Sequence, residues 1–280
     1  MNRKVGLVVD STFGLDQKFI KENQISVVPL KVIIDDKEYI DGEINPDLVV
    51  AALREGKHVK TSQPAPELFI KAYEEQLNTF SSVICLTISK TLSGTVNSAT
   101  LGQTILDNKN IYVVDTETTI NGGQYLSEKM IEFLNEGHQA TEALTHLEEL
   151  KDKGSLVFTI DNLQTLVKNG RIGKISAMIG NVLKIKPILR FRKGVLDLEH
   201  KVRSFKNVML YLTDEVKKML NYGNVVVYIA YVDRSVEAKE LEHEIFQLGD
   251  HVTTKITGVI SPVVSAHVGL GGLGIYLTNE

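Results

Sequence analysis

The sequence predicts an α/β protein of two α/β domains, the first with a mostly parallel sheet. Short apolar runs alternate with segments of helical periodicity through the first half, which is typical of a parallel sheet covered by helices on both faces. The chain has 280 residues, more than one minimal domain needs and enough for two. We place the boundary near Gly154, which gives an N-terminal domain of residues 1–153 and a C-terminal domain of residues 154–280.

In the first half, turn and cap residues separate the expected elements. Asp35-Asp36 lies between two apolar runs and predicts a hairpin. Asn45-Pro46 predicts a helix start, because Asn caps well and Pro fits the first helical turn. A second helix is expected to follow Pro66, where apolar residues recur at helical spacing. Strands are expected at 5–9, 25–34, 37–40, 82–88 and 110–114, and further helices at 95–106, 120–134 and 141–150.

In the second half, the same signals continue. Lys193-Gly194 predicts another hairpin, and the turn Gly170-Arg171-Ile172-Gly173 precedes an apolar helical stripe from Ile175 to Leu183. We read residues 261–269 as a loop. Strands are expected at 156–160, 187–191, 195–198, 225–232 and 252–257, and helices at 163–169, 175–183, 205–220 and 236–248.

Composition and cysteine use indicate a cytoplasmic protein. Hydrophobic residues make up 43% and charged residues 24% of the chain, as in ordinary globular proteins. The N-terminus shows no signal-peptide pattern, and no apolar run reaches the roughly 18 residues of a membrane span. The lone Cys85 lies in an apolar run, so we expect a buried side chain rather than a nucleophile. We therefore expect no stable membrane insertion.

Cofactor motifs are not expected to function in this chain. Residues 269–274 match the dinucleotide pattern G-x-G-x-x-G, but only six residues follow, too few for the helix that such a site requires. The P-loop pattern is absent. The seven His residues and one Cys show no ligand spacing, so no metal is expected.

Positive charge is concentrated in one segment. From Lys168 to Lys206 there are eleven Lys and Arg and two acids, a net +9, which leaves −13 for the rest of a chain of total charge −4. This zone is either a face for an anionic partner or a set of separately solvated lysines. It also raises the hypothesis of a nucleic-acid-associated regulator, although only Phe191 and Phe205 add aromatic groups and no binding motif accompanies them.

Three loops form the candidate binding site. Thr61-Ser62-Gln63-Pro64 precedes a helix, and Leu92-Ser93-Gly94-Thr95 connects a strand to a helix. Free N–H groups and the helix dipole favour an anion at such positions. In the third loop, His267 lies between small residues and glycines, which suits an imidazole that a carboxylate or phosphate oxygen can reach.

Other interpretations of these residues stay open. Asp10-Ser11-Thr12 and Asp115-Thr116 also follow strands and should lie at the same sheet edge, where ligands usually bind. Taken one loop at a time, the hydroxyls are better explained as helix caps, because Ser and Thr are the usual N-cap residues. A hydrolase or acyl-transferring enzyme would use Ser93 and His267, with Asp10 or Asp115, but the G-x-S-x-G elbow is absent.

Together the loops resemble the DegV family. The matching segments follow one another in order along nearly the whole chain, so the resemblance is specific as a set. The family often has Asp-Ser where this chain has Asp115-Thr116, and Gly-Pro where it has Ser261-Pro262. The matches are Asp10-Ser11-Thr12, Thr61-Ser62-Gln63-Pro64, Leu86-Thr87-Ile88-Ser89, Leu92-Ser93-Gly94-Thr95, Val114-Asp115-Thr116, Gly170-Arg171-Ile172-Gly173, Lys186-Pro187-Ile188-Leu189 and His267-x-Gly269.

The resemblance implies a function and its residues. Family members bind one long-chain fatty acid between two α/β domains, without catalysis of their own. They present its carboxylate to a separate ATP-dependent fatty-acid kinase subunit, which supplies acyl phosphate for phospholipid metabolism. Arg171 and Arg203 become candidate docking residues for the kinase, and Ile120 and Phe158 candidate tunnel residues. The residues implied to surround the carboxylate are Thr61, Ser93 and His267, with Ser62 and Gly94 nearby.

Overall fold

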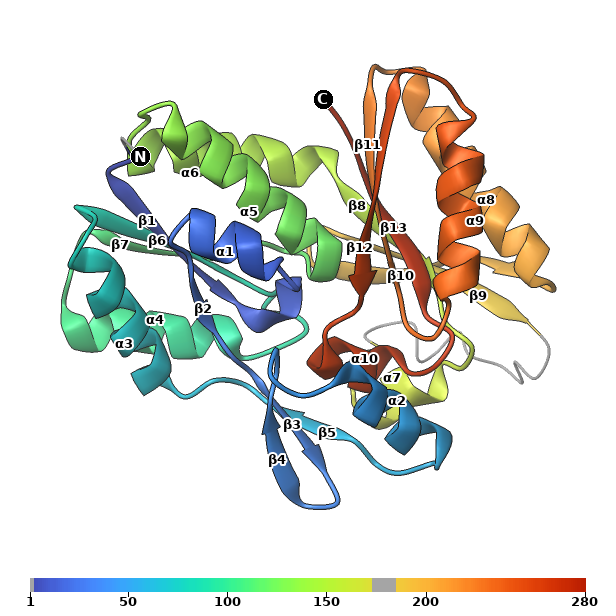
Figure 1. The fold of residues 1–280 in the computed structure, drawn as a ribbon, viewed down its shortest axis with the longest axis horizontal. Helices are drawn as coiled ribbons and strands as arrows, with labels where there is room; N and C mark the ends of the chain where they lie inside the picture. The colour runs from blue at the N-terminus through green and yellow to red at the C-terminus, as the bar shows by residue number, and fades with distance from the viewer. Residues whose placement is uncertain (1–2, 173–184) are drawn as a thin grey trace.

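The computed structural model describes residues 3–172 and 185–280, which form two larger sheets and one small sheet with covering helices (Figure 1). The helix predicted at 175–183, and Gly173 of the turn before it, lie outside the described residues. The elements of the first half are β1 (Val5–Asp10), η1 (Ser11–Phe13), α1 (Gln17–Glu22), β2 (Ser26–Val28), β3 (Lys31–Ile34), β4 (Lys37–Ile40), α2 (Pro46–Arg54), β5 (Lys60–Ser62), α3 (Pro66–Leu77), β6 (Ser82–Thr87), α4 (Thr95–Leu106), β7 (Ile111–Asp115), α5 (Ile120–Asn135) and α6 (Ala140–Lys153). Those of the second half are β8 (Ser155–Thr159), α7 (Gln164–Lys168), β9 (Lys186–Arg192), β10 (Val195–Val202), α8 (Phe205–Leu220), β11 (Val225–Tyr231), α9 (Ser235–Phe246), β12 (Val252–Val259), α10 (Pro262–Val268) and β13 (Leu273–Asn279).

The N-terminal sheet has the order β2-β1-β6-β7, and all of its strands run parallel, as predicted. Its side chains alternate between two helical layers, α3 and α4 on one face and α5 and α6 on the other (Figure 1). Val8 and Cys85 pack toward α3 and α4, whereas Val9 and Leu86 pack toward α5 and α6. Cys85 is fully buried, as predicted, and burial raises the pKa of its thiol to about 12.

The six-stranded sheet has the order β10-β9-β8-β13-β11-β12 and mixes parallel with antiparallel pairs. Helices α8 and α9 cover one face, where Val225, Val227 and Ile229 are buried. The alternate residues of β11, among them Tyr228 and Ala230, face the other way and lie in other core clusters. This second face is therefore free of α8 and α9 and is turned toward the N-terminal half.

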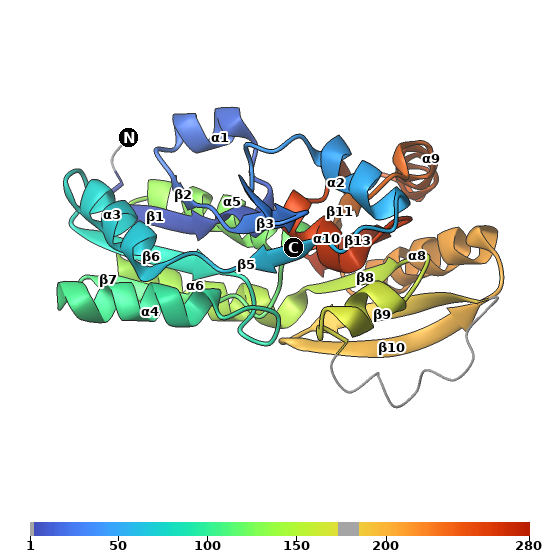
Figure 2. The ribbon, with the colours of Figure 1, turned by 90° about the horizontal axis from the view of Figure 1, so that it is seen from below.

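A small sheet of order β4-β3-β5 joins the two halves. The single strand predicted at 25–34 is wrong: β2 and β3 belong to different sheets, and Pro29, which has no N–H to donate, separates them. Thr61 and Ser62, expected in a loop, lie in β5 and pair with β3. Figure 2 shows this sheet and α10 at the junction of the two larger sheets.

The C-terminal segment contains two elements that the sequence patterns missed. His267 was expected off any helix, but it lies in the last turn of α10. This helix starts with a recognisable signal, since the Ser261 side chain accepts from the Val264 N–H and Pro262 occupies the first turn. The glycine run leads into β13, which pairs with β8 and β11, so a strand follows it where a dinucleotide site would need a helix.

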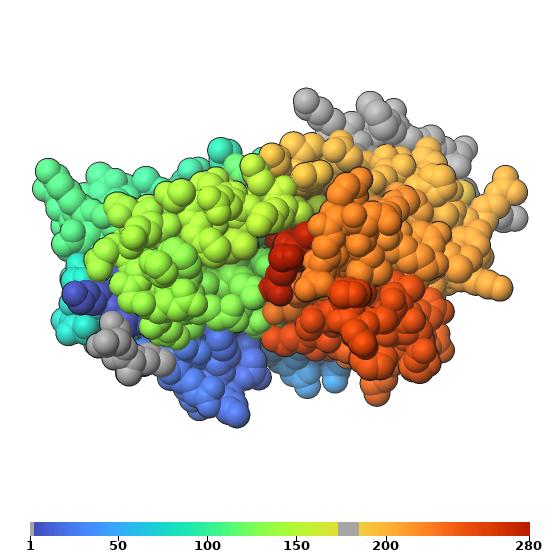
Figure 3. Space-filling model, turned by 90° about the horizontal axis from the view of Figure 1, so that it is seen from above, coloured from blue at the N-terminus to red at the C-terminus, as the bar shows by residue number. Residues whose placement is uncertain are grey.

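Ion pairs join the halves along the upper face. Lys129 on α5 lies 2.6 Å from the Glu280 carboxylate, and Lys255 on β12 lies 2.8 Å from Glu128. Figure 3 shows the dark red C-terminal residues between the yellow-green α5–α6 layer and the orange segments of the second half. The domain boundary between residues 153 and 154 falls between α6 and β8 and stays a prediction. None of the described helices is long and apolar enough to span a bilayer.

Candidate functional site

A cavity of about 360 Å³ lies between the second face of the six-stranded sheet and the loops of the N-terminal half. Its volume is within the range of small-molecule sites. Most of its wall is apolar, and the apolar lining includes Leu156, Phe158, Phe191, Leu196, Ala230 and Val264. The polar lining is smaller and consists mainly of Thr61, Ser62, Gln63, Ser93, Thr119, Asn121, Arg171 and His267.

Thr61 and His267 meet at this cavity although 206 positions separate them in the sequence. The Thr61 Oγ1 and His267 Nε2 atoms are 2.8 Å apart. Burial, and secondarily the positive charge of Arg171, lowers the pKa of His267 to about 4, so the imidazole is neutral at pH 7. Its Nδ1 has no hydrogen-bond partner within the described residues. One ring nitrogen thus contacts Thr61, and the other is buried.

Ser93 lies at the cavity just before α4. Its Oγ lies 2.8 Å from the Thr95 Oγ1 and also accepts from the Thr95 N–H. Gly94, predicted near the carboxylate, is not among the described cavity-lining residues. A Cβ atom at Gly94 would lie 2.0 Å from the Gln63 Oε1, so the glycine allows Gln63 to approach α4. Gln63 in turn donates to the Ser98 Oγ at 2.8 Å.

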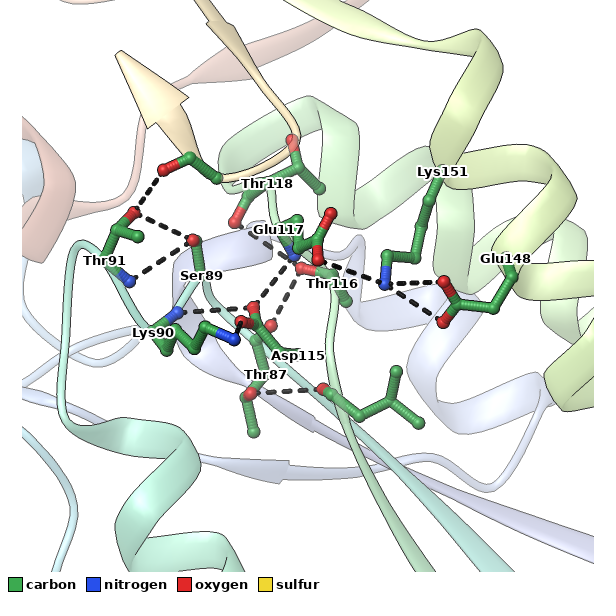
Figure 4. A network of polar contacts seen from close by, with 12 residues as sticks. Thr87, Ser89, Lys90, Thr91, Asp115, Thr116, Glu117, Thr118, Glu148 and Lys151 are labelled. Carbon is green, nitrogen blue, oxygen red and sulfur yellow. Dashed lines mark hydrogen bonds and ion pairs between the residues drawn. The ribbon is translucent and has the colours of Figure 1, made fainter.

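The two aspartates of the hydrolase hypothesis are bound elsewhere. Asp10 is fully buried and accepts from the Ile88 N–H (2.5 Å) and the Thr12 N–H (2.9 Å). Asp115 accepts from the backbone N–H groups of Lys90 and Glu117 (Figure 4). Neither carboxylate is bonded to His267, whose Nε2 is held by Thr61. These bonds organise loops and do not form the Ser-His-Asp chain that a triad requires.

The loops after β6 and β7 also hold the tip of the β9–β10 hairpin (Figure 4). Thr91 Oγ1 donates to the Gly194 carbonyl at 2.8 Å, and the Gly194 N–H donates to the Glu117 carbonyl at 3.0 Å. Ser89, in turn, lies 3.0 Å from the Thr91 hydroxyl. This contact fixes one wall of the cavity, carried by the C-terminal half, against the loops that carry Ser93.

Asp41 connects the His267 helix to the end of β1. The Ser11 Oγ donates to Asp41 Oδ2 at 2.6 Å, and the Val263 N–H donates to Oδ1 at 3.2 Å. Asp41 is only 3% exposed. Burial, opposed by these hydrogen bonds and assisted by the nearby Asp10 charge, raises the pKa of Asp41 from 3.8 to about 6.

We expect Asp41 to make the fold more stable at pH 5 than at pH 7.5. Between the ordinary and the raised pKa, the folded protein binds more protons than the unfolded chain, so this contribution is lost as pH rises through about 6. The loss amounts to about 1 kcal/mol of unfolding free energy between the two pH values. Urea unfolding of the wild type and Asp41→Asn measures it, because the variant should lack this part of the pH dependence. Equal pH dependence in both proteins would contradict the prediction.

The two predicted docking arginines lie in different surroundings. Arg171 lines the cavity, where its Nε donates to the Leu92 carbonyl at 3.1 Å and its Nη1 to the Asn169 carbonyl at 2.5 Å. Arg203 is exposed in the segment between β10 and α8. A cation therefore borders the hydroxyl cluster, which the loop sequences alone did not indicate. The kinase contact of both arginines stays a prediction.

Acidic side chains neutralise part of the basic zone. Lys186 is paired with Asp161, and Lys193 lies 2.7 Å from Asp152. Arg190 donates from its Nε to Glu199 at 2.8 Å. The charge excess in the sequence therefore overstates the positive charge of this surface, which weakens the ground for the nucleic-acid hypothesis.

Both predicted tunnel residues, Ile120 and Phe158, line the cavity. Thr119 and Asn121, on either side of Ile120, line it as well and were missed. Their sequence signal is weak, because a Thr before a helix is an ordinary cap and an Asn near a helix start attracts no attention. Ala230 was missed because it belongs to a continuous apolar strand, whose two faces the sequence does not distinguish.

Comparisons with known proteins all indicate the same family. A family model described as "Uncharacterised protein, DegV family" matches residues 4–280. A DegV domain-containing protein of Staphylococcus aureus (strain COL) is 33% identical over 285 residues, covering 98% of each chain. The structure of a DegV family protein from Thermus thermophilus, described by its fatty acid binding, has 29% identity and a TM-score of 0.91, covering 99% of this chain and 100% of that one. DegV from Bacillus subtilis, described as a fatty acid binding protein, has 25% identity, a TM-score of 0.90 and the same coverage. These similarities confirm the predicted α/β fold.

Proposed function

The chain belongs to the DegV family, and we propose that it binds a long-chain fatty acid in the cavity, with the carboxylate at Thr61, Ser93 and His267. The make-up of the cavity carries this proposal: an apolar wall with hydroxyls and a neutral imidazole gathered among its polar residues. The descriptions of the Thermus thermophilus and Bacillus subtilis structures as fatty-acid-binding proteins support the ligand class.

The acyl chain supplies most of the affinity in this proposal. Burial is worth about 0.8 kcal/mol per methylene, so about ten buried methylenes contribute roughly 8 kcal/mol before ordering costs, which corresponds to micromolar binding. A hydrogen bond to the carboxylate adds about 1 kcal/mol. The hydroxyls of Thr61 and Ser93 therefore orient the head group more than they retain the lipid. Ser62, which also lines the cavity, is a further candidate donor.

The chain is proposed to present the carboxylate to a separate ATP-dependent fatty-acid kinase subunit, and not to react with it. The motif resemblance supports this partner. The carboxylates of Asp10 and Asp115 accept from backbone N–H groups, and neither is bonded to His267 as a catalytic triad would require. A carboxylate held mainly by neutral donors keeps its nucleophilic character. Arg171 also lines the cavity, and its positive charge would offset part of the negative charge of the bound carboxylate.

Mass spectrometry of the purified protein tests the ligand class. We expect the native mass to exceed the chain mass by one long-chain fatty acid, and organic extraction to release that acid with its length and unsaturation. We expect this because burial of an acyl chain in the apolar cavity is strongly favourable, so the lipid should stay bound during purification. A protein that is isolated without lipid and does not take up added fatty acid would contradict the proposal.

A further inference from the structure

A chain of buried hydrogen bonds starts at the end of β1. Asp10 accepts from the Ile88 N–H at 2.5 Å. The next residue, Ser11, accepts from the Leu30 N–H at 3.0 Å, and its hydroxyl donates to Asp41 Oδ2 at 2.6 Å. Asp10 is fully buried and Asp41 is 3% exposed. The end of β1 is thus joined to two other segments by buried side chains.

Asp41 extends this chain of hydrogen bonds to α10. Its Oδ1 accepts from the Val263 N–H at 3.2 Å, in the first turn of the helix, where N–H groups have no partner inside the helix. Val263 precedes His267 by four residues, so the two lie on the same face of α10. Ile88, Leu30 and Val263 all line the cavity. Each backbone group that the chain holds therefore belongs to the cavity wall.

Each of the three held segments carries one residue of the proposed carboxylate cluster. The loop that begins at Ile88 leads to Ser93. Leu30 directly precedes β3, which pairs with β5 and so places Thr61. Helix α10 carries His267, whose Nε2 lies 2.8 Å from the Thr61 Oγ1. The relative placement of the three cluster residues therefore depends on how the end of β1 holds these segments.

The charges in the chain favour a positioning role over simple packing. A buried carboxylate is costly for stability, because water no longer solvates it. The donors that the structure gives to Asp10 and Asp41 are N–H and O–H groups without charge. Hydrogen bonds to an ionised acceptor are shorter and stronger than those to a neutral oxygen, so they restrict the position of the donor more narrowly.

We propose that the chain of Asp10, Ser11 and Asp41 positions the carboxylate cluster, and that the cavity thereby distinguishes a fatty acid from a lipid with an uncharged head group. The inference rests on the proposed function. A carboxylate accepts from several donors at once, whereas an alcohol has one hydroxyl that can rotate toward a displaced partner. None of the three residues is among the described cavity-lining residues, so they act through the segments that they hold.

Competition binding of palmitic acid and hexadecanol to the wild type and Ser11→Ala tests the inference. We expect the wild type to bind the acid about tenfold more tightly than the alcohol, as for additional hydrogen bonds to a charged group. Ser11→Ala should lower this preference to about twofold and leave the affinity for the alcohol unchanged. A loss of folded protein alone would weaken both ligands by the same factor.

Asp41→Asn provides a second variant, in case Ser11→Ala does not fold. It keeps the size of the side chain and removes its charge, so it should lower the preference for the acid as well. Because Ser11 and Asp41 act in one chain, combining the two substitutions should lower the preference little further than Ser11→Ala alone. Thermal melting of each variant verifies that it is folded.

The matched control is Ser155→Ala. Ser155 is 8% exposed, as is Ser11, and its Oγ accepts from the Arg190 Nη1 at 2.7 Å. It lies in β8 and is not a described cavity-lining residue. Ser155→Ala should therefore keep the preference of the wild type, even where its melting temperature is lower.

The outcomes separate this inference from the proposed function. If Ser11→Ala and Asp41→Asn keep the preference of the wild type, or weaken both ligands equally, the inference is overturned. A loss of preference in Ser155→Ala to the same extent also overturns it, because any loss of stability would then suffice. If the wild type binds both ligands equally, the proposed carboxylate cluster fails and the inference fails with it. If it binds neither, the proposed ligand class fails, and again the inference with it.

Discussion

Ala230→Phe is expected to weaken fatty-acid binding by more than about 100-fold while the protein stays folded. Ala230 lies on the cavity face of β11, opposite Gly274 of β13, where two small residues leave the sheet surface open. A phenyl ring there would take the room of about four methylenes, which are worth roughly 3 kcal/mol of burial. Titration with a fluorescent fatty acid, read together with thermal melting, measures both properties.

The matched control is the same substitution on the surface. Ala51 is exposed on α2 and is not a cavity-lining residue, so Ala51→Phe should bind fatty acid like the wild type. An Ala230→Phe protein that still carries one fatty acid per chain would show that the acyl chain lies elsewhere. A loss of binding in both variants would indicate a general effect of the added ring and would contradict a specific role of Ala230 in the cavity.

Local patterns predicted most of the fold. Helix α4 was expected at 95–106 from its place between two strands, and helix α8 was expected at 205–220. Both are found with these bounds, and α8 starts with a local signal, since the Ser204 side chain accepts from the Asn207 N–H. The strand β5 could not be predicted in this way, because its sequence Lys60-Thr61-Ser62 has no apolar alternation. The segment is extended because it pairs with β3. The strand β13 begins within glycines, and Gly274 is required by a distant neighbour: a Cβ atom there would lie 2.4 Å from the Phe158 Cβ. Such tertiary requirements leave no pattern in the nearby sequence.

The candidate site was predictable to the extent that topology determines it. Ser93 and the end of β1 could be grouped because parallel strands end at one edge. The contact of Thr61 with His267 depends on how α10 packs against the small sheet, and the approach of Arg171 depends on a turn of the C-terminal half. Thr119 and Asn121 line the cavity because the start of α5 meets β11, where the Asn121 amide donates to the Tyr228 carbonyl, and this long-range contact leaves no sign in the nearby sequence.

Ser93→Ala is expected to slow acyl-phosphate formation by about 100-fold while most of the lipid stays bound. In this reaction a carboxylate oxygen attacks the γ-phosphorus of ATP and ADP leaves, so the carboxylate must be held in line with the phosphate. A lost hydroxyl donor costs about 1 kcal/mol of affinity, which is small beside the burial of the tail. A donor that orients a reacting oxygen is worth about 100-fold or more in rate. Hydroxamate trapping with ATP and a purified fatty-acid kinase subunit measures the rate, and extraction measures the lipid.

The effects of Ser93→Ala on the rate of acyl-phosphate formation and on the amount of bound lipid together define the role of Ser93. Ser235, exposed at the start of α9, gives the matched control, and Ser235→Ala should leave rate and lipid unchanged. An unchanged rate in Ser93→Ala would contradict the orienting role, whereas loss of the lipid would contradict binding dominated by the tail. Turnover of an activated ester by the wild type, abolished in Ser93→Ala without any kinase, would instead support the acyl-transfer alternative. The two hypotheses therefore differ in whether ATP and the second subunit are needed for Ser93 to matter.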